Sequence, residues 1–144
     1  MANLIHSILP EPRRSIVYIH PDVSVAQCVA IMVQDNIGAL VVTDDDNILG
    51  IVSERDVVRA LVHKGLSPAS TKVSDILHAD VTVLQSSDTV ERAMEAITYT
   101  KRRHLLVAED GQIIAILSIG DLLFNLLEDK ARMIEQLENY IHTY

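Results

Sequence analysis

The chain has 144 residues and a mass of 16.0 kDa, and 49% of its residues are hydrophobic. This composition is typical of a globular domain with a substantial core and excludes a largely disordered chain. The formal net charge of −8 disfavours sequence-independent binding to nucleic acid, which needs a basic surface. Aromatic residues make up only 3% and include no tryptophan, so a base-stacking platform is not expected either.

The sequence carries no signal for membranes or secretion. No apolar run approaches the length of a membrane span. The first ten residues lack both the basic region and the long apolar stretch of a secretory signal. The single cysteine, Cys28, excludes an internal disulfide and fits a reducing compartment. We therefore expect a cytoplasmic protein without membrane association.

The first half of the chain predicts the order strand, helix, strand, strand, helix. Short apolar runs predict the strands, and apolar residues at i, i+3, i+4, i+7 and i+8 predict the first helix. That spacing is carried by Val25, Cys28, Val29, Met32 and Val33. The predicted elements are strand 16–19, a helix through 25–33, strands 39–42 and 48–52 around the turn 43–47, and a helix from about 54 to 63, where Lys64-Gly65 ends it.

The second half predicts the same order after a linker at 66–70. The predicted elements are a short helix within 71–78, strand 81–84, a helix carrying Val90, Ala93, Met94 and Ile97, strands 105–107 and 113–117 around the turn 109–112, and a helix from 121 to about 141. The last helix is about twice as long as its counterpart. Its apolar face is longer than one half of the chain can cover, so we expect a partner subunit to cover it.

The two halves are a sequence repeat, because residues 16–61 align with residues 81–126 at a constant offset of 65. The identical pairs are Val25/Val90, Leu40/Leu105, Val42/Val107, Asp45/Asp110, Ile48/Ile113, Ile51/Ile116, Ser53/Ser118, Asp56/Asp121 and Leu61/Leu126. Most of these pairs keep an apolar core, whereas the Ser and Asp pairs indicate function. We expect two related units, residues 1–70 and 71–144, that share a core and meet at a cleft.

Each half places a Ser-x-x-Asp motif directly after an apolar strand. The ordinary role of this motif is a capping box, whose loss costs about 1 kcal/mol. A helix N-terminus also offers free N–H groups and partial positive charge, so it can hold a phosphate. The carboxylate one turn later can accept hydrogen bonds from two vicinal ribose hydroxyls. Two copies in register favour nucleotide contact over capping alone.

A cationic run, Lys101-Arg102-Arg103-His104, lies between a predicted helix and a predicted strand of this acidic chain. Arginine matches phosphate oxygens, but charge runs are commonly solvated, and the residues leave phosphate binding and surface display open. Arg55, beside Ser53, is a second phosphate candidate, although by itself it is more typical of a surface residue. Gly38 either ends the preceding helix or lets a flat base approach the backbone.

Other chemistry is not indicated. The turn 43–47 lacks the ligand spacing of a calcium loop, and the histidines lack the spacing of a metal site. Cys28 lies on the apolar stripe and is expected to be a small buried hydrophobe. No phosphate-binding glycine loop, nucleophile elbow or zinc-protease motif is present, and no nucleophile is paired with a base. We therefore expect neither catalysis nor a metal or catalytic cofactor.

These residues resemble a pair of cystathionine β-synthase (CBS) domains, also called a Bateman module, over about residues 16–128. Residues 50–56, Gly-Ile-Val-Ser-Glu-Arg-Asp, are close to the family signature Gly-hydrophobic-hydrophobic-Ser/Thr-x-x-Asp, and residues 37–42 and 103–105 match its second-strand pattern. The stand-alone two-domain type, like the regulatory insert of IMP dehydrogenase, is the most similar. The resemblance implies an α/β (α+β) fold of two β-α-β-β-α repeats related by a pseudo-twofold axis, here with an extended C-terminal helix.

The resemblance also implies binding of an adenine nucleotide in the clefts between the repeats. AMP is the first expectation, with ATP or NAD as further ligands. Asp56 and Asp121 would hold ribose hydroxyls, and Ser53 and Ser118 would contact phosphate. The other implied contacts are Arg55, Arg103 and His104 for phosphate charge, and the backbone around Val17, Ile37, Gly38, Ala39, Val81 and Ala115 for the adenine.

The second signature departs from the first, because Ala115 replaces Gly50 and Ile119-Gly120 replaces Glu54-Arg55, while Leu106 stands where the family commonly has proline. We therefore expect two inequivalent sites, the second better equipped for phosphate. The expected function is a cytoplasmic, homodimeric sensor of an adenine nucleotide that changes conformation or its binding to an unidentified protein target. The alternatives are a constitutive dimeric scaffold with vestigial ligand sites and a small nucleotide-utilising enzyme.

Overall fold

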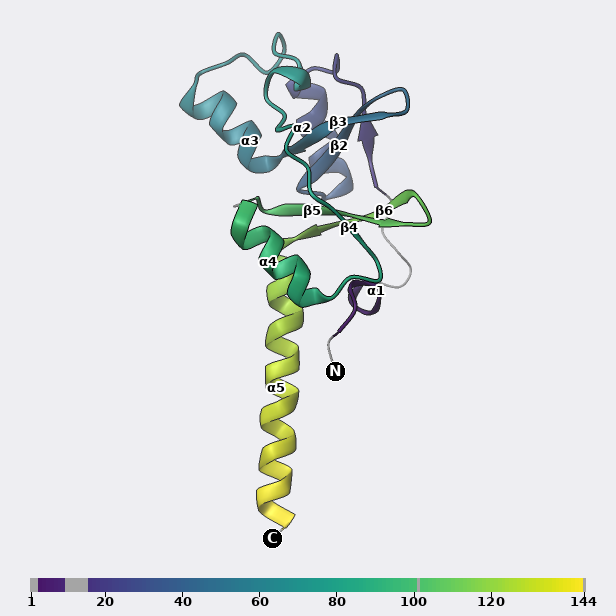
Figure 1. Cartoon of the computed structure of the whole chain (residues 1–144). Helices are drawn as coiled ribbons and strands as arrows, with labels where there is room; N and C mark the ends of the chain where they lie inside the picture. The colour runs from purple at the N-terminus through teal and green to yellow at the C-terminus, as the bar shows by residue number, and fades with distance from the viewer. Residues whose placement is uncertain (1–2, 10–15, 101, 144) are drawn as a thin grey trace. The chain divides into compact units, whose positions relative to one another are not determined.

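The computed structural model describes residues 3–9, 16–100 and 102–143 (Figure 1). These residues form two compact units, one of residues 16–81 and one of residues 3–9 together with the described residues from 82 onward. The first unit contains β1 (Tyr18–Ile19), α2 (Val25–Asp35), β2 (Ala39–Asp44), β3 (Asn47–Ser53), α3 (Glu54–Val58), a π-helix (Arg59–His63) and a 3₁₀ turn (Val73–Asp75). The second contains α1 (Ile5–Ile8), β4 (Val83–Gln85), α4 (Val90–Thr100), β5 (His104–Glu109), β6 (Gln112–Ser118) and α5 (Ile119–Thr143).

Each unit has a three-stranded sheet with the same topology, so the fold is mixed α+β as predicted. The sheet orders are β1-β2-β3 and β4-β5-β6, with the first pair parallel and the second antiparallel in both. Both antiparallel ladders begin at equivalent pairs, Ala39 with Ser53 and His104 with Ser118, and both contain a register shift at the same place, after Val42 and after Val107. The sequence repeat is therefore also a repeat of backbone hydrogen bonding.

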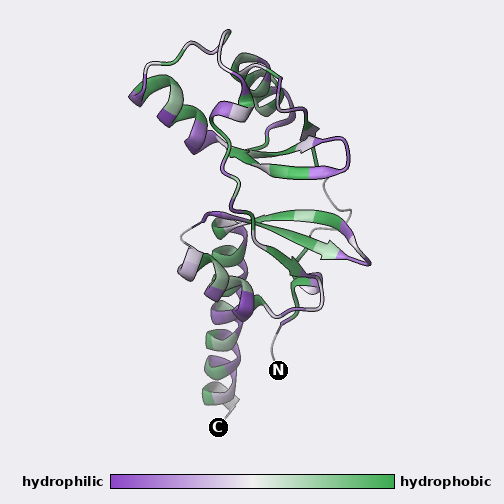
Figure 2. Ribbon diagram, turned by 45° about the horizontal axis from the view of Figure 1, so that its top comes forward, coloured by the Kyte–Doolittle hydropathy of each residue, from purple (hydrophilic) through white to green (hydrophobic). Residues whose placement is uncertain are grey.

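In each unit, one helix of the β-α-β crossover packs on the sheet. The apolar residues of α2 follow the Ser24 cap, whose hydroxyl accepts from the Gln27 N–H at 3.1 Å. The core of the first unit is formed mainly by Ile19, Val25, Cys28, Met32, Leu40, Val42, Val52, Val57 and Val73. The core of the second is formed mainly by Ile5, Leu9, Leu84, Val90, Ala93, Ile97, Leu105, Val107, Leu117 and Leu122. Figure 2 shows hydrophobic residues along the strands of both sheets.

Both cores are completed by a segment that precedes the other repeat in the sequence. Val73, from the segment 71–78 that leads into the second repeat, is fully buried in the first unit, and its N–H donates to Val23 at 2.9 Å. Ile5, which precedes the first repeat, is fully buried in the second unit, and its N–H donates to Asp88 at 2.9 Å. We call this arrangement the segment exchange. Because of it, the compact units divide the chain differently from the predicted halves 1–70 and 71–144.

Several predicted elements are shorter than expected. The predicted strands 16–19 and 81–84 form ladders only at Tyr18–Ile19 and Val83–Gln85, and the predicted helix in 71–78 is only a 3₁₀ turn. The predicted helix 54–63 changes from α to π after Val58, because the Lys64 N–H donates to the Arg59 carbonyl five residues back at 3.0 Å. Val33, predicted on the buried stripe, is 75% exposed. Its position is rotated roughly 80° from Val25 around the helix axis, at the margin of the stripe.

The long C-terminal helix is present, and only its first turns belong to the core. Leu122 is fully buried, whereas every large apolar side chain from Leu123 to Ile141 is at least 39% exposed. Figure 1 shows α5 running well past α4 and the sheet of its own unit, and Figure 2 shows hydrophobic residues continuing along it. The described helices include none that is both long and apolar enough to cross a membrane.

Candidate functional site

In the first unit, the β2–β3 ladder brings the predicted site residues of this half together. Ala39 pairs with Ser53, and the Glu54 N–H donates to the Gly38 carbonyl at 3.0 Å. Ser53 therefore ends β3 beside the start of β2, and α3 begins with the next residue. A Cβ atom at Gly38 would meet the Glu54 carboxylate at 3.5 Å, an ordinary contact, so packing alone does not require glycine there.

Ser53 and Asp56 form a complete capping box. Asp56 Oδ2 accepts from the Ser53 backbone N–H and from the Ser53 hydroxyl, both at 2.8 Å. The Asp56 N–H donates back to Ser53 Oγ at 3.3 Å. The ordinary role of the motif is thus confirmed at this position, and the nucleotide-binding role is an addition to it.

The same carboxylate oxygen has a further partner that the sequence did not indicate. Nδ1 of His78 lies 3.0 Å from Oδ2 of Asp56, and both side chains are largely buried, at 17% and 15% exposure. Because an ionised carboxylate only accepts hydrogen bonds, Nδ1 of His78 carries a proton in this contact. Burial alone would raise the pKa of Asp56, but the hydrogen bonds from His78 and Ser53, with the attraction of His78, hold that pKa below its ordinary value of 3.8.

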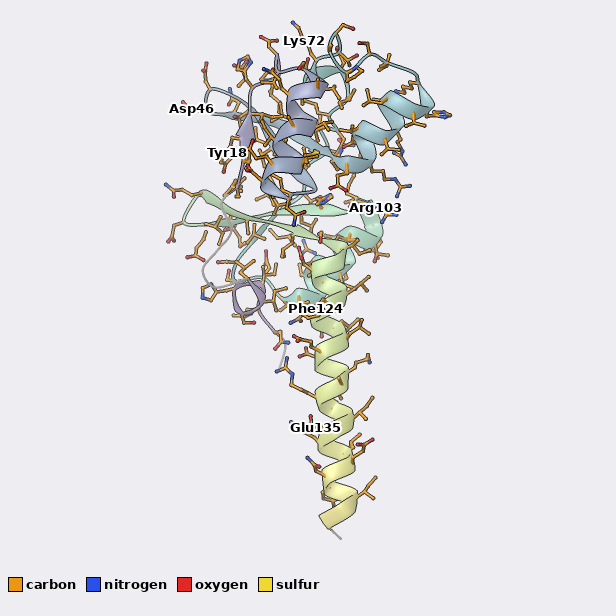
Figure 3. The ribbon with its side chains drawn as sticks, turned by 180° about the vertical axis from the view of Figure 1, so that it is seen from behind. Tyr18, Asp46, Lys72, Arg103, Phe124 and Glu135 are labelled. Atoms are coloured by element: carbon orange, nitrogen blue, oxygen red, sulfur yellow. The ribbon has the colours of Figure 1, made fainter. Side chains whose placement is uncertain are left out.

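In the second unit, the equivalent ladder brings Arg103 and His104 beside Ser118 and the start of α5. His104 pairs with Ser118, and the Ile119 N–H donates to the Arg103 carbonyl at 2.8 Å, the counterpart of the Glu54–Gly38 bond. Figure 3 shows Arg103 near the start of α5. The side chain of Arg103 is exposed, and Lys101 of the cationic run lies outside the described residues.

The second capping box is more open than the first. The Ser118 N–H donates to Asp121 Oδ2 at 2.9 Å, and the Asp121 N–H donates to Ser118 Oγ at 3.1 Å. Asp121 is exposed, and within the described part of the chain its carboxylate accepts only this one hydrogen bond. Most of its capacity for accepting hydrogen bonds is therefore available to a ligand.

The remaining predicted contacts are distributed along the sheets. The Val17 carbonyl accepts from the Val41 N–H at 3.1 Å, which places Val17 beside β2. The corresponding position in the second unit is Thr82, whose carbonyl accepts from Leu106 at 3.0 Å, and Val81 precedes it.

Three other predicted residues differ in exposure. Ile37 is partly buried against the first core, Ala115 is partly buried in β6, and Arg55 is exposed on α3. The structure thus groups the predicted residues within each half, and a cleft formed jointly by the two halves stays a prediction.

The replacement of Gly50 by Ala115 has a structural reason. Residue His78 pairs with Ile51 through two backbone hydrogen bonds of 3.1 Å, one in each direction. A Cβ atom at Gly50 would lie 2.3 Å from the His78 carbonyl oxygen and 2.9 Å from Leu77 Cδ1. Glycine is therefore required in the first unit by the close approach of the segment 71–78. Ala115 carries a Cβ atom, so a chain segment cannot approach β6 in the same way.

His78 is the functional candidate that the sequence did not reveal. It lies outside the repeat, and its contact with Asp56 joins residues 22 positions apart. Among the described residues, no group of three or more His, Cys, Asp or Glu side chains has the geometry of a metal site. Cys28 is fully buried, as predicted, and burial raises the pKa of its thiol to about 11.

Comparison with known proteins identifies related sequences and folds. The family model of the CBS domain matches residues 5–63 and 73–128. The mitochondrial CBS domain-containing protein CBSX3 of Arabidopsis thaliana is 35% identical over 126 residues, 83% of this chain. This chain spans 61% of the length of that relative and 20% of the length of a longer A. thaliana relative.

Two solved structures extend the comparison. The CBS-domain protein ATU1752 from Agrobacterium tumefaciens has 34% identity and a TM-score of 0.77, over 85% of this chain and 98% of that one. The crystal structure of CBSX2 in complex with AMP has 27% identity and a TM-score of 0.66, over 89% of this chain and 98% of that one.

Proposed function

The chain belongs to the CBS-domain family, and on this premise we propose that it is a regulatory module that binds an adenine nucleotide, with AMP as the first candidate. The observation that supports the proposal most is that the junction between the last strand and the following helix has the same structure in both halves. In both halves a Ser-x-x-Asp capping box follows the last strand of the sheet and lies beside the start of the middle strand. A solved relative, CBSX2, was crystallised with AMP, which favours this ligand class.

The chemistry of the junctions suits a nucleoside monophosphate. A carboxylate accepts strongly from vicinal ribose hydroxyls, and Asp121 has this capacity available. The N-terminus of α5 carries partial positive charge, and the exposed Arg103 lies beside it, so a phosphate there would meet positive charge. We assign Asp121 and Asp56 to ribose, Ser118 and Ser53 to phosphate, and the strand backbones to adenine.

A ligand would regulate this module by binding one arrangement of the two halves more tightly than another. A ligand shifts a conformational equilibrium only by its difference in affinity for the two states. The consequence would be read by a protein target that remains to be identified. The match of CBS-domain models to residues 5–63 and 73–128 favours a regulatory role over the alternative of a nucleotide-utilising enzyme.

The proposal is tested by thermal denaturation with AMP, ADP, ATP, NAD, NADH, S-adenosylmethionine and GMP. At a ligand concentration near 100 times the dissociation constant, binding adds about 2.7 kcal/mol to the free energy of unfolding. For a chain of this size that raises the melting temperature by roughly 5 to 10 °C. We expect a shift with adenine ligands and none with GMP, and no turnover of AMP, ATP or NAD in a parallel assay.

The matched variants locate the binding. Asp121→Ala should abolish most of the shift, whereas Asp46→Ala, which removes an exposed carboxylate from the β2–β3 turn, should leave it unchanged. No shift with any nucleotide would refute the proposal and favour the scaffold alternative. Turnover of a nucleotide would favour the enzyme alternative instead.

We further propose that α5 makes the protein a homodimer by packing against α5 of a second copy. The exposed apolar residues of α5 recur every seven residues in three rows, Leu126/Met133/Tyr140, Leu123/Leu137 and Leu127/Ile134/Ile141. A seven-residue repeat favours pairing with another helix in a left-handed coiled coil. Lys130 occupies the middle position of the second row, and a single lysine at such a position specifies register and oligomeric state.

The exposed area is of the size that a dimer needs. The eight side chains in these rows are between 39% and 68% exposed. At on the order of 100 to 200 Å² for each large apolar side chain, they present roughly 500 to 900 Å² per subunit. A specific interface buries about 800 Å² on each partner. A second copy of the chain presents the same apolar face on its own α5, so pairing of the two helices would cover all three rows.

Analytical ultracentrifugation tests the dimer. We expect the protein to sediment at about twice the subunit mass of 16.0 kDa. Leu137→Glu should yield monomers without unfolding the subunit, because Leu137 is 60% exposed. Ala131→Glu places the same charge outside the three apolar rows of α5 and should leave the dimer intact. A monomeric wild-type protein, or equal effects of the two variants, would contradict the proposal.

A further inference from the structure

The two capping boxes differ in how much of their carboxylate is already used. In the first unit, all three hydrogen bonds that described residues make to the Asp56 carboxylate end on Oδ2, from the Ser53 N–H, the Ser53 hydroxyl and His78. A carboxylate oxygen has about two lone-pair directions, so Oδ2 is saturated. In the second unit, described residues make one hydrogen bond to Asp121 Oδ2, from the Ser118 N–H.

The three donors on Asp56 are not equivalent. The two from Ser53 belong to the capping box and are fixed by the start of α3. The third comes from the segment 71–78, whose backbone is tied to β3 by the two His78–Ile51 hydrogen bonds. The segment is therefore anchored through its backbone, whereas the imidazole ring can turn away from Asp56 by rotation of its side chain. Among the three donors, His78 is the one that a ligand can displace without opening the cap.

From these contacts we propose that His78 competes with the nucleotide for Asp56, so that the site at Asp121 fills first and the site at Asp56 fills only when His78 gives way. This inference rests on the proposed nucleotide binding. Vicinal ribose hydroxyls bind a carboxylate best when both of its oxygens accept, and with Oδ2 saturated only Oδ1 of Asp56 is left for them. His78 lowers the affinity of the first site, and it also couples that site to the segment 71–78, which leads directly into the second repeat.

The Gly50/Ala115 difference supports the same asymmetry by an independent observation. In the first unit, glycine at position 50 admits the segment that carries His78 to within contact of β3. In the second unit, the Cβ atom of Ala115 excludes an equally close segment, and Asp121 is exposed. A chain segment that carries a competing side chain can therefore pack close to β3 beside Asp56, but it cannot pack equally close to β6 beside Asp121.

Isothermal titration with AMP tests the proposal in a background that isolates the first site. In Asp121→Ala, the remaining binding reports on Asp56. Adding His78→Ala to this background should tighten AMP binding by about fivefold to tenfold, because one competing hydrogen bond is removed. Adding His78→Asn instead should change the affinity by less than about twofold, because the Asn amide offers an N–H near the position of Nδ1.

The reciprocal background is the control. In Asp56→Ala, the remaining binding reports on Asp121, and His78→Ala should leave it unchanged. An unchanged AMP affinity in Asp121→Ala/His78→Ala would overturn the inference. A weakened affinity would also overturn it, because it would mean that His78 contacts the ligand. Absence of binding of any adenine nucleotide to the wild-type protein would instead refute the proposed function, and the inference with it.

A measurement on the wild-type protein avoids dependence on the variants. The His78 imidazole resonances can be followed by nuclear magnetic resonance during the AMP titration. They should stay in place while the first equivalent binds and shift as the second binds. A shift that is complete after the first equivalent would contradict the proposed order of filling.

Discussion

Replacing Gly50 by alanine is a direct test of how the segment 71–78 is held. The new Cβ atom would lie 2.3 Å from the His78 carbonyl oxygen and 3.0 Å from the His78 carbonyl carbon. Both contacts are with backbone, which cannot rotate away as a side chain can. The segment must therefore shift, and the two His78–Ile51 hydrogen bonds of 3.1 Å would lengthen or break.

The size of the effect follows from these contacts. Two backbone hydrogen bonds contribute about 1 kcal/mol each, and overpacking of this kind costs about 1 to 3 kcal/mol. We expect Gly50→Ala to lower the free energy of unfolding by about 2 to 4 kcal/mol, or the melting temperature by roughly 5 to 15 °C. The matched variant Ala115→Gly adds a glycine to the equivalent strand position and should cost only about 0.5 to 1 kcal/mol.

Urea denaturation followed by circular dichroism measures both variants. Amide hydrogen exchange of Ile51 and His78 provides the local readout, because these N–H groups should lose protection in Gly50→Ala and keep it in Ala115→Gly. If Gly50→Ala is within about 0.5 kcal/mol of the wild type, or if the two variants are equally destabilised, the reasoning about the close approach is wrong.

Three further predictions concern the cores and the titrating groups. Because the folded-state pKa of Asp56 lies below 3.8, the ionised carboxylate stabilises the fold above that pH, and this stabilisation is lost as the pH falls through the folded-state pKa. The difference in the free energy of unfolding between the wild type and Asp56→Asn should therefore shrink between pH 5 and pH 2 in urea titrations. A constant difference would contradict this prediction. Cys28, with its pKa raised to about 11, should react with a thiol reagent at pH 8 only as fast as the protein unfolds, and rapid labelling of the folded protein would contradict its burial. Ile5→Ala should cost about 2 to 5 kcal/mol in urea denaturation, whereas Leu4→Ala, at 44% exposure, should cost little, and equal small effects would argue against the segment exchange.

The sequence predicted the repeated order of elements because the apolar spacing and the turn residues act locally. The Ser53 cap and the turns at Asp45 and Asp110 require only neighbouring residues, and all three lie where the sequence placed them. The strand ends were less predictable, because pairing in a sheet depends on a partner strand. Ile16 and Val81 have the apolar character of strand residues, yet the parallel ladders begin only at Tyr18 and Val83.

The site was predictable to the same extent. The offset of 65 aligned Ser53 with Ser118 and Asp56 with Asp121. The two ladders place the serines at equivalent positions, and the two capping boxes do the same for the aspartates. The His78–Asp56 contact was not predictable, because it depends on a segment outside the repeat that returns to the first sheet. The sequence indicates this contact only through the difference between Gly50 in the first half and Ala115 at the equivalent position of the second half.

The segment exchange sets an order on folding during synthesis. Ile5 and Leu9 are translated before the residues that cover them, since their partners extend from Leu84 to Leu122. These apolar side chains have no core to join until the second repeat has left the ribosome. The first sheet is in turn complete only when Val73 has been made. The N-terminal segment is thus the first of these parts to be translated and among the last to be buried, which makes it the part most in need of protection from aggregation on the nascent chain.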